Sequence, residues 1–322
     1  MAEASYVISV DLGGTNLRVG LVRENGVVES RERFPSESRS EGAVILERVA
    51  QAVKAAAAKV EALNGTIAGV ALGFPGIVDP GKGVVYQSPH FPDWKDLEIL
   101  PYFKNELPWP VILDNDANFV ALGEGWMGAG RGLKNFVMMT LGTGVGGGIV
   151  IDGRVWHGDG GFAGEVGHIC IETEGPQCAC GSRGCLEMYV SATGILRLVE
   201  ASDHPEGRDA LLEKFGRPLA RLTVEDLYKA AMDGDIFSNV IFKKMGYYLG
   251  IGIASLTNAF GIENFILGGG VSQAWDFFIE PAKKELSERT YRETARRVRV
   301  HRAQLDDDAG LVGGASHYFK KN

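Results

Sequence analysis

Short apolar runs that end in glycine-rich turns dominate the start of the chain. Residues 6–11 form such a run and predict a buried strand. Residues 17–22 alternate and predict a second strand, and residues 27–34 predict a third strand that returns after a hairpin turn at 24–26. Residues 42–63 instead carry apolar residues at helical spacing, and they predict a helix that ends at an asparagine–glycine pair.

The same order of elements recurs in the middle of the chain. Residues 136–141 predict a strand, a glycine turn follows, and residues 148–151 and 154–156 predict two further strands. The order strand, glycine turn, strand, tight turn, strand therefore occurs twice. This weak internal symmetry predicts two similar domains with a cleft between them.

The remaining patterns predict alternating strands and helices. A glycine-rich loop at 73–83 follows the buried strand predicted at 67–72. A helix is predicted to begin near Ala117. The polar stretch 202–217 is the most loop-like insertion. The other elements that we expect are strands at 67–72, 111–113, 264–267 and 297–304 and helices at 189–200, 223–233, 236–259, 276–289 and 310–320.

Length and charge narrow the class of protein. The chain has 322 residues, of which 45% are hydrophobic, and a formal net charge of −8. We expect a smaller N-terminal domain at 1–118 plus about 305–322 and a larger C-terminal domain at 119–304. The acidic balance disfavours nucleic acid or an anionic membrane as a partner. We expect neither a signal peptide nor a membrane span, and a cytoplasmic location.

Three of the four cysteines lie close together in the segment 161–187. Cys178, Cys180 and Cys185 have the spacing C-x-C-x4-C, and His168 lies ten residues before the first of them. Thiolate and imidazole are the ligands that tetrahedral zinc prefers. The sequence therefore predicts a zinc site, and with four protein ligands its role would be structural.

The alternative is a set of unrelated buried cysteines beside a core histidine. The segment is polar and rich in glycine, unlike the core of a strand or helix, and glycines 181 and 184 would let the sulfurs converge. A disulfide is disfavoured because nothing marks the chain as secreted. Cys170 remains as an ordinary buried thiol. Glu165 and Glu187 flank the cluster, which would hold both carboxylates and His168 in fixed positions.

Two glycine turns join predicted strands, D-L-G-G-T-N at 11–16 and L-G-T-G-V-G-G-G at 141–148. Consecutive N–H groups in such turns form anion-binding nests, and Thr15 and Thr143 add hydroxyl groups. We expect the turns to hold a polyphosphate. The second turn leads into a strand, which disfavours a Rossmann site, and no Walker A loop is present. Glycine hairpins without a ligand are the alternative.

A polar cluster, D-N-D-A-N at 114–118, follows a buried strand. Asp114 and Asp116 would point to the same face if the strand continued. Either carboxylate could accept the proton of a hydroxyl that attacks a phosphate. Asp116 could instead cap the helix that follows. The residues alone do not choose between the two aspartates.

These motifs, together with G-F-P-G-I-V-D and G-E-V-G-H, occur in the order found in the ROK family of sugar kinases, and the chain resembles that family over almost its whole length. The resemblance implies an α/β, actin-like ATPase fold (ribonuclease H-like) of two similar domains. It also implies ATP-dependent phosphorylation of glucose to glucose 6-phosphate, with ATP and Mg²⁺ as cofactors beside a structural Zn²⁺. Relatives are commonly homodimers or homotetramers.

The resemblance also implies roles for individual residues. Asp116 would be the general base, and Asn115 would hold the sugar. The sugar would also contact Gly76, Glu165, His168 and Glu187. The phosphates would face Gly13, Gly14, Thr15, Asn16, Thr143 and Gly144, with Asp11 near Mg²⁺ and Gly269 and Gly270 on the nucleotide side. His168 would bind zinc through one ring nitrogen and face the sugar with the other.

Other functions remain open. A kinase for N-acetylmannosamine, N-acetylglucosamine or another hexose would differ only in the sugar pocket, and His90 stands where relatives often carry asparagine. A sugar-responsive repressor is disfavoured, because the first strand begins near Tyr6 and leaves no room for a DNA-binding domain before it. A catalytically silent zinc scaffold is disfavoured by the intact Asp116 and glycine turns.

Overall fold

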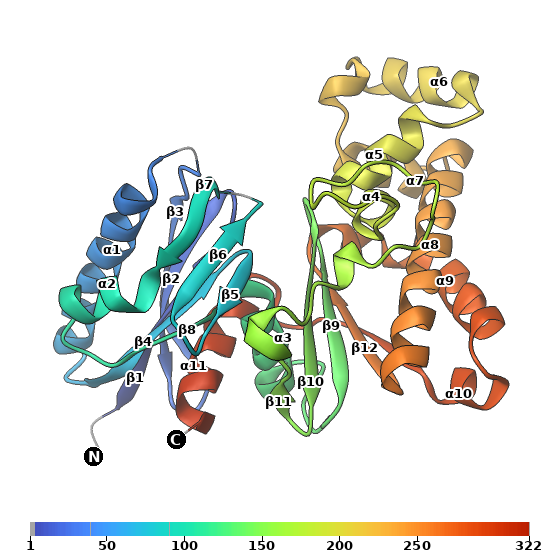
Figure 1. The fold of residues 1–322 in the computed structure, drawn as a ribbon. Coiled ribbons are helices and arrows are strands. Elements are labelled where there is room, and N and C mark those ends of the chain that lie inside the picture. Colours follow the sequence, from blue (N-terminus) through green and yellow to red (C-terminus); the bar gives the residue numbers. More distant parts are fainter. Residues whose placement is uncertain (1–3, 39, 90, 322) are drawn as a thin grey trace. The chain divides into compact units, whose positions relative to one another are not determined.

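The computed structural model describes residues 4–38, 40–89 and 91–321. The chain divides into two compact units (Figure 1). Unit 1 comprises residues 1–138, 148–164 and 303–322, and unit 2 comprises residues 139–147 and 165–302. The domain limits expected at residues 118 and 305 stay a prediction. His90 lies outside the described residues.

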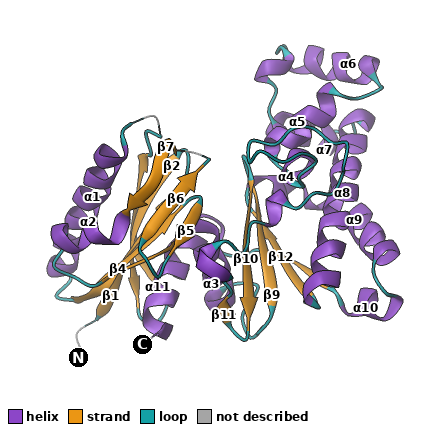
Figure 2. Cartoon of the chain, viewed as in Figure 1, coloured by secondary structure: helices purple, strands orange, loops and turns teal. Residues whose placement is uncertain are grey.

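The first sheet, in unit 1, has the strand order β3-β2-β1-β4-β8. Its strands are among those drawn in orange in Figure 2. Strand β1 is antiparallel to β2 and parallel to β4, which is parallel to β8. All five predicted strands of this region are confirmed. Their bounds are β1 Ser5–Leu12, β2 Asn16–Arg23, β3 Val28–Pro35, β4 Thr66–Phe74 and β8 Val111–Asn115.

Helices cover both faces of this sheet, which explains the unbroken apolar run in β1. Ile8 and Val10 pack in one core cluster with the helix α1 (Gly42–Ala62). Val7, on the opposite face, packs with Phe119 and Leu311 of the helices α3 (Asp116–Met127) and α11 (Ala309–Lys321). Strands covered on both faces lose the alternation of apolar and polar residues.

Glycines let α3 and α11 approach closely. A Cβ atom on Gly123 would lie 2.1 Å from the Ala309 carbonyl oxygen, and one on Gly313 would lie 1.6 Å from the Phe119 carbonyl oxygen. Neither position therefore accepts a larger residue without moving a backbone. This contact fixes the helix that begins with Asp116.

A small antiparallel sheet in unit 1 was not predicted. Its strands are β5 (Ile77–Asp79), β6 (Val84–Ser88) and β7 (Phe91–Glu98), and the helix α2 (Ile99–Glu106) follows. The expected loop at 73–83 is therefore wrong where β4 and β5 occupy it. Glycine, proline and aspartate lie at the end of β4 and on both sides of β5, and they obscure the strand pattern.

The second five-stranded sheet has the order β11-β10-β9-β12-β13, and the division between the units passes through β9 and β10. Counted along the chain, this order repeats that of the first sheet, so the predicted internal repeat is confirmed for the sheets. The bounds are β9 Phe136–Leu141, β10 Val145–Ile151, β11 Arg154–Val155, β12 Asn264–Gly268 and β13 Arg299–Arg302.

The rest of unit 2 is mainly helical, as predicted. One correction concerns residues 202–217, which contain the helix α6 (Pro205–Phe215) and not a loop. Only Leu211 of this helix is buried, so its sequence lacks the apolar stripe that predicts helices. The other helices are α4 Glu187–Val190, α5 Ala192–Glu200, α7 Val224–Met232, α8 Ile236–Phe260, α9 Trp275–Arg289 and α10 Arg292–Arg297.

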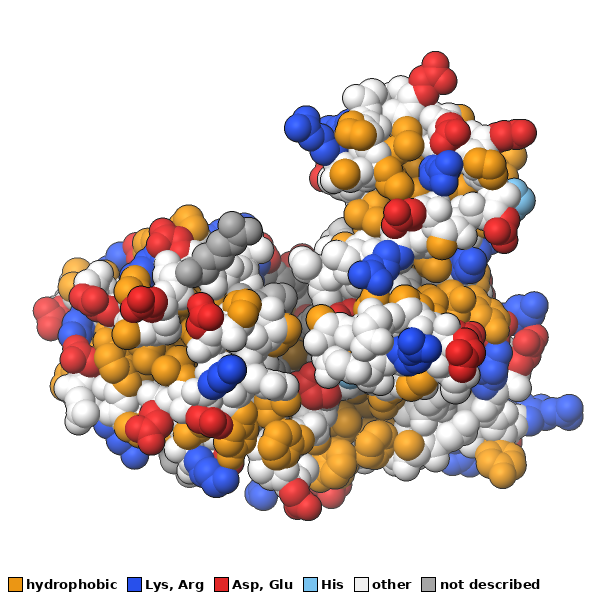
Figure 3. Space-filling model, turned by 45° about the horizontal axis from the view of Figure 1, so that its top comes forward, with side chains coloured by type: hydrophobic (Ala, Val, Ile, Leu, Met, Phe, Trp, Pro, Cys, Tyr) orange, Lys and Arg blue, Asp and Glu red, His pale blue; other side chains and the backbone are white. Residues whose placement is uncertain are grey.

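Short 3₁₀ helices connect these elements: η1 Asp159–Gly161, η2 Val166–His168, η3 Leu219–Arg221, η4 Gly270–Ala274 and η5 Asp306–Asp308. Among the described residues, no helix is both long and apolar enough to cross a membrane. Acidic and basic side chains are interspersed on the face of the molecule shown in Figure 3.

Candidate active site and metal centre

The four predicted zinc ligands converge in unit 2. One ligand atom from each of His168, Cys178, Cys180 and Cys185 lies within 4.8 Å of the others. Cys178 Sγ is 3.6 Å from His168 Nδ1, and Cys180 Sγ is 3.7 Å from Cys185 Sγ. A tetrahedron with zinc–sulfur bonds of about 2.3 Å has sulfur–sulfur edges of about 3.8 Å. The group therefore has the size and donor set of a tetrahedral zinc site.

Two left-handed glycines shape the loop that carries the sulfurs. Gly181 has φ +94° and Gly184 has φ +64°, and a Cβ on Gly184 would lie 1.6 Å from the Glu172 carbonyl oxygen. The Cys178 N–H donates to the Ser182 carbonyl oxygen and closes the turn. The predicted role of these glycines is confirmed.

Burial disfavours the thiolate form at two of the three cysteines. It raises the pKa of Cys185 to about 12 and also raises the pKa of Cys178. Zinc ligation requires thiolates, so a bound cation would offset this burial. One prediction here is wrong: Cys170 is exposed, because its segment forms only an isolated bridge that no sheet covers.

Glu165 lies beside the other ring nitrogen of His168. Its Oε2 atom is 3.8 Å from His168 Nε2, while Nδ1 faces the sulfurs. The side chain of Glu165 is 41% exposed, yet the surrounding protein removes enough solvent to raise its pKa, against the opposing effect of His168. His168 can thus bind a metal through Nδ1 and leave Nε2 for a second partner.

Glu187 connects the metal loop to the second glycine turn. It is the first residue of α4, two positions after Cys185, and its Oε2 accepts a hydrogen bond from Val145 N at 2.8 Å. A Cβ on Gly144 would lie 2.6 Å from the same oxygen. A larger residue at position 144 would displace this carboxylate, which fixes the end of the turn.

The start of α5 holds the remainder of this turn. The Ala192 N–H donates to the Gly142 carbonyl oxygen at 2.8 Å, and Thr193 Oγ1 donates to the Thr143 carbonyl oxygen at 3.1 Å. Thr143 itself is exposed. These contacts occupy carbonyl oxygens of the turn and leave an exposed threonine beside glycine N–H groups.

The first glycine turn, in unit 1, joins β1 and β2. The Gly13 N–H donates to the Asn16 carbonyl oxygen at 2.8 Å, and Thr15 is exposed. Asp11, at the end of β1, is buried and pairs with Arg18, whose Nη1 lies 3.0 Å from Asp11 Oδ2. Burial raises the pKa of Asp11, although Arg18 opposes that effect. Mg²⁺ at Asp11 would have to share the carboxylate with Arg18.

The structure separates the roles of Asp114 and Asp116. Asp114 is fully buried at the end of β8 and accepts hydrogen bonds from Asn115 N at 2.7 Å and Asn118 Nδ2 at 2.8 Å. His157 Nε2 lies 2.9 Å from its other oxygen. Asp116, at the first position of α3, is only partly buried. The predicted common face required a strand that continues through both residues, but β8 ends at Asn115 and α3 begins at Asp116, so the two carboxylates lie in different environments.

Asn115 caps α3, a role that the sequence had offered to Asp116. Its Oδ1 accepts from Ala117 N at 2.9 Å and Asn118 N at 3.2 Å. Its Nδ2 donates to the Gly76 carbonyl oxygen at 2.9 Å. Gly76 has φ +104°, and a Cβ there would lie 2.2 Å from the Gln87 carbonyl oxygen. Unit 1 thus brings Gly76, Asn115 and Asp116 together.

Gly269 and Gly270 follow β12 in unit 2. Gly269 has φ +83°, and a Cβ on it would lie 2.4 Å from the carbonyl oxygen of Leu141, the residue before the second turn. Both glycines are exposed. Sequence reasoning missed the contacts of His157 and Thr193, and it missed Ser36, whose hydroxyl donates to the Gly14 carbonyl oxygen. Each lies far along the chain from the group that it contacts, and no local pattern marks it.

The chain was compared with known proteins. A sequence model of the ROK family matches residues 7–321. The glucokinase of Halalkalibacterium halodurans is 38% identical over 98% of this chain and 94% of the relative. The glucokinase of Thermotoga maritima is 34% identical over 96% of each chain. The structure of a ROK family glucokinase from Streptomyces griseus in complex with glucose and AMPPNP matches with a TM-score of 0.79, at 32% identity over 96% of this chain and 98% of that one.

The repeated strand order, with a glycine turn after the first strand of each sheet, defines an actin-like ATPase, and the similar ROK kinases share this fold. Among actin-like ATPases, the family is identified by the metal-ligand group and by the sequence model that matches residues 7–321. The chain belongs to the ROK family.

Proposed function

We propose that this protein is a sugar kinase that transfers the terminal phosphoryl group of ATP to glucose and forms glucose 6-phosphate and ADP. The observation that carries the proposal is the match, over nearly the full length, to glucokinases at 38% and 34% identity. The similar Streptomyces griseus enzyme has been solved with glucose and AMPPNP. The alternative sugars have no comparable support among these relatives.

Asp116 is the base in this proposal. The oxygens of Asp114 already accept hydrogen bonds, and the residue is fully buried, whereas Asp116 is partly exposed. Asp116 also stands at the N-terminus of α3, where the helix dipole stabilises a carboxylate. It accepts the proton of the 6-hydroxyl while that oxygen bonds to the γ-phosphorus and the bond from phosphorus to ADP breaks.

The sugar hydroxyls contact Gly76, Asn115, Glu165, His168 and Glu187 in this proposal. The supporting geometry is local to each unit: Asn115 and Gly76 are hydrogen-bonded beside Asp116, and Glu165 flanks His168. When Zn²⁺ is bound at Cys178, Cys180, Cys185 and His168, it supplies a structural anchor. His168 Nδ1, which faces the sulfurs, would hold the metal, and Nε2 would then carry the ring proton and donate it in a hydrogen bond to the sugar.

The two glycine turns bind the donor. Their N–H groups, with the exposed Thr15 and Thr143, face the phosphates, and the residues involved are Gly13, Gly14, Thr15, Asn16, Thr143 and Gly144. Gly269 and Gly270 line the nucleotide side, and Asp11 lies near Mg²⁺. Such nests stabilise phosphate charge without many basic side chains.

A panel of sugars tests the proposed function. We would measure ADP formation from Mg-ATP with glucose, mannose, fructose, N-acetylglucosamine and N-acetylmannosamine. The highest kcat/KM is expected with glucose. Preference for an acetylated sugar would contradict glucose as the substrate but keep the kinase, and failure with every sugar would contradict the kinase itself.

The similar proteins do not establish the oligomeric state or the cellular location of this protein. A homodimer or homotetramer stays a prediction, which light scattering of the purified protein would test. A cytoplasmic location also stays a prediction, and fractionation of cells that produce the full chain would test it.

A further inference from the structure

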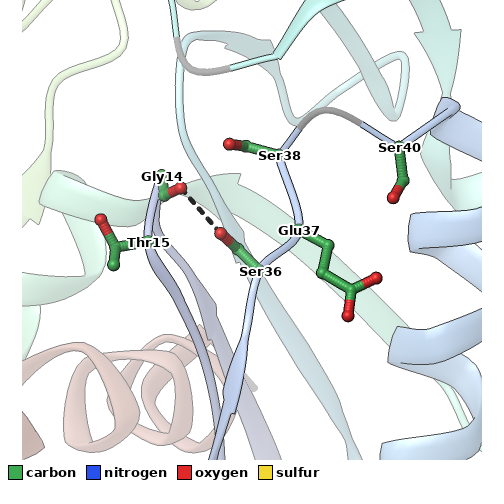
Figure 4. Close-up of a pocket in the computed structure, with 6 residues that line it drawn as sticks. All are labelled: Gly14, Thr15, Ser36, Glu37, Ser38 and Ser40. Atoms are coloured by element: carbon green, nitrogen blue, oxygen red, sulfur yellow. Dashed lines mark hydrogen bonds between the residues drawn. The ribbon is translucent and has the colours of Figure 1, made fainter.

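Ser36 contacts the carbonyl side of the first glycine turn. It follows β3, and only 3% of the residue is exposed. Its Oγ donates to the Gly14 carbonyl oxygen at 2.7 Å, which Figure 4 marks with a dashed line, and its N–H donates to the Thr15 carbonyl oxygen at 3.0 Å. One residue thus engages two consecutive carbonyl groups of the turn.

These two bonds determine where the N–H groups of the turn point. In a trans peptide the carbonyl and the following N–H point in opposite directions. Because Ser36 holds the Gly14 and Thr15 carbonyls, the N–H groups of Thr15 and Asn16 face away from it. Within the described part of the chain, the Thr15 N–H has no hydrogen-bond partner. An outward row of N–H groups is what a phosphate nest requires.

The segment that carries Ser36 is itself anchored to α1. Glu37 adopts a left-handed φ of +49°, and its carboxylate pairs with Arg48 Nη1 of α1 at 2.7 Å. Arg48 Nη2 also donates to the Pro35 carbonyl oxygen at 3.1 Å. Residues on both sides of Ser36 are therefore fastened to one helix side chain, so the hydroxyl is presented from a fixed position.

A cavity of about 490 Å³ lies at this junction. Its lining, drawn in Figure 4, consists of Gly14, Thr15, Ser36, Glu37, Ser38 and Ser40. Ser38 provides a second hydroxyl in the same cavity, but it makes no hydrogen bond to the turn within the described residues. The chain thus offers a matched pair of serines, of which only Ser36 holds the turn.

We propose that Ser36 is a positioning residue for the phosphoryl donor: by fixing the Gly14 and Thr15 carbonyls, it aligns the N–H groups that bind the phosphates of ATP. The inference rests on the proposed role of this turn in donor binding. It assigns to Ser36 an effect on phosphate recognition and none on the adenosine moiety or on glucose.

The test compares Ser36→Ala and Ser38→Ala with the wild type. Calorimetry with Mg-AMPPNP, without sugar, is expected to give a Kd about 2- to 10-fold higher for Ser36→Ala, because one hydrogen bond to a neutral group is lost. The Kd values of adenosine and glucose and the melting temperature should stay within twofold and a few degrees of the wild type. Ser38→Ala should match the wild type throughout.

An unchanged Kd for AMPPNP in Ser36→Ala would overturn the inference, and so would an equal loss for AMPPNP, adenosine and glucose. A wild type that binds no AMPPNP would overturn it as well. A wild type that binds AMPPNP but does not phosphorylate glucose would contradict only the proposed function, since the Ser36→Ala ratio is measured without turnover.

Discussion

The variant Asp116→Asn should lower the rate of phosphoryl transfer strongly while changing the stability of the fold little. The substitution keeps the size of the side chain and removes its charge and basicity. Asp116 Oδ1 accepts a hydrogen bond from Ala117 N at 2.9 Å, and an amide oxygen can keep that bond. The substitution also removes the interaction of the carboxylate with the N-terminus of α3, which contributes about 0.3–1 kcal/mol.

The effect on catalysis should be several times larger. A general base contributes about 10²- to 10⁴-fold to the rate, which corresponds to about 3–5 kcal/mol at 1.36 kcal/mol per tenfold. We therefore expect kcat for glucose phosphorylation to fall by about 10²- to 10⁴-fold. The free energy of unfolding should change by about 1 kcal/mol or less, and the affinity for glucose should remain measurable.

The matched control is Asp114→Asn. That carboxylate is fully buried and receives two hydrogen bonds besides its contact with His157. The amide NH₂ group of the variant would face N–H donors that now contact the carboxylate, at a cost of about 1–3 kcal/mol in stability. Coupled assays with urea unfolding distinguish the two variants. The reasoning fails if Asp116→Asn keeps more than a tenth of the wild-type kcat while a folded Asp114→Asn loses all activity.

Three further predictions follow from other parts of the site and fold. Cys185→Ser, or chelation, should release one zinc per chain and lower both the melting temperature and the affinity for glucose, because structural zinc contributes about 10 kcal/mol of apparent folding free energy. Metal analysis and thermal melting check this prediction. A metal-free protein of full stability would contradict it. Glu187→Ala should raise the Kd of Mg-AMPPNP about 5- to 100-fold, because the Val145 N–H loses its hydrogen-bond acceptor. Glu187→Gln keeps an acceptor oxygen and should recover most of the affinity. Equal losses of affinity in both variants would refute the role of that hydrogen bond. The N–H of Lys82 holds the pKa of Asp79 below its usual 3.8, so the carboxylate stabilises the fold above pH 3.8 and loses this contribution as the pH falls through its folded pKa. Between about pH 5 and 2, the melting temperature should therefore decline less for Asp79→Asn than for the wild type. Parallel declines of the two melting temperatures would refute this role of Asp79.

Sequence patterns predicted the parts of the fold that depend on local order. The apolar runs at 6–11 and 136–141, each followed by a glycine turn, became the central strands β1 and β9. The metal ligands were predicted because cysteine spacing is itself a local signal, and the three sulfurs and His168 do converge. In both cases, residues close in sequence determine the structure.

The parts that failed depend on distant contacts. Asp114 and Asp116 look alike in the sequence, and the burial of Asp114 and its contacts with Asn118 and His157 distinguish them. The helix α6 has one buried residue, so it lacked an apolar stripe. Ser36 lies in a serine-rich loop whose composition predicts no contact with Gly14.

The most direct test of the account is the stoichiometry of the reaction. Purified protein with Mg-ATP and limiting glucose should form one glucose 6-phosphate, detected with glucose-6-phosphate dehydrogenase, for each ADP, and Asp116→Asn should form neither at a comparable rate. Formation of ADP without glucose 6-phosphate, or equal product from Asp116→Asn, would contradict the proposed transfer to glucose with Asp116 as base.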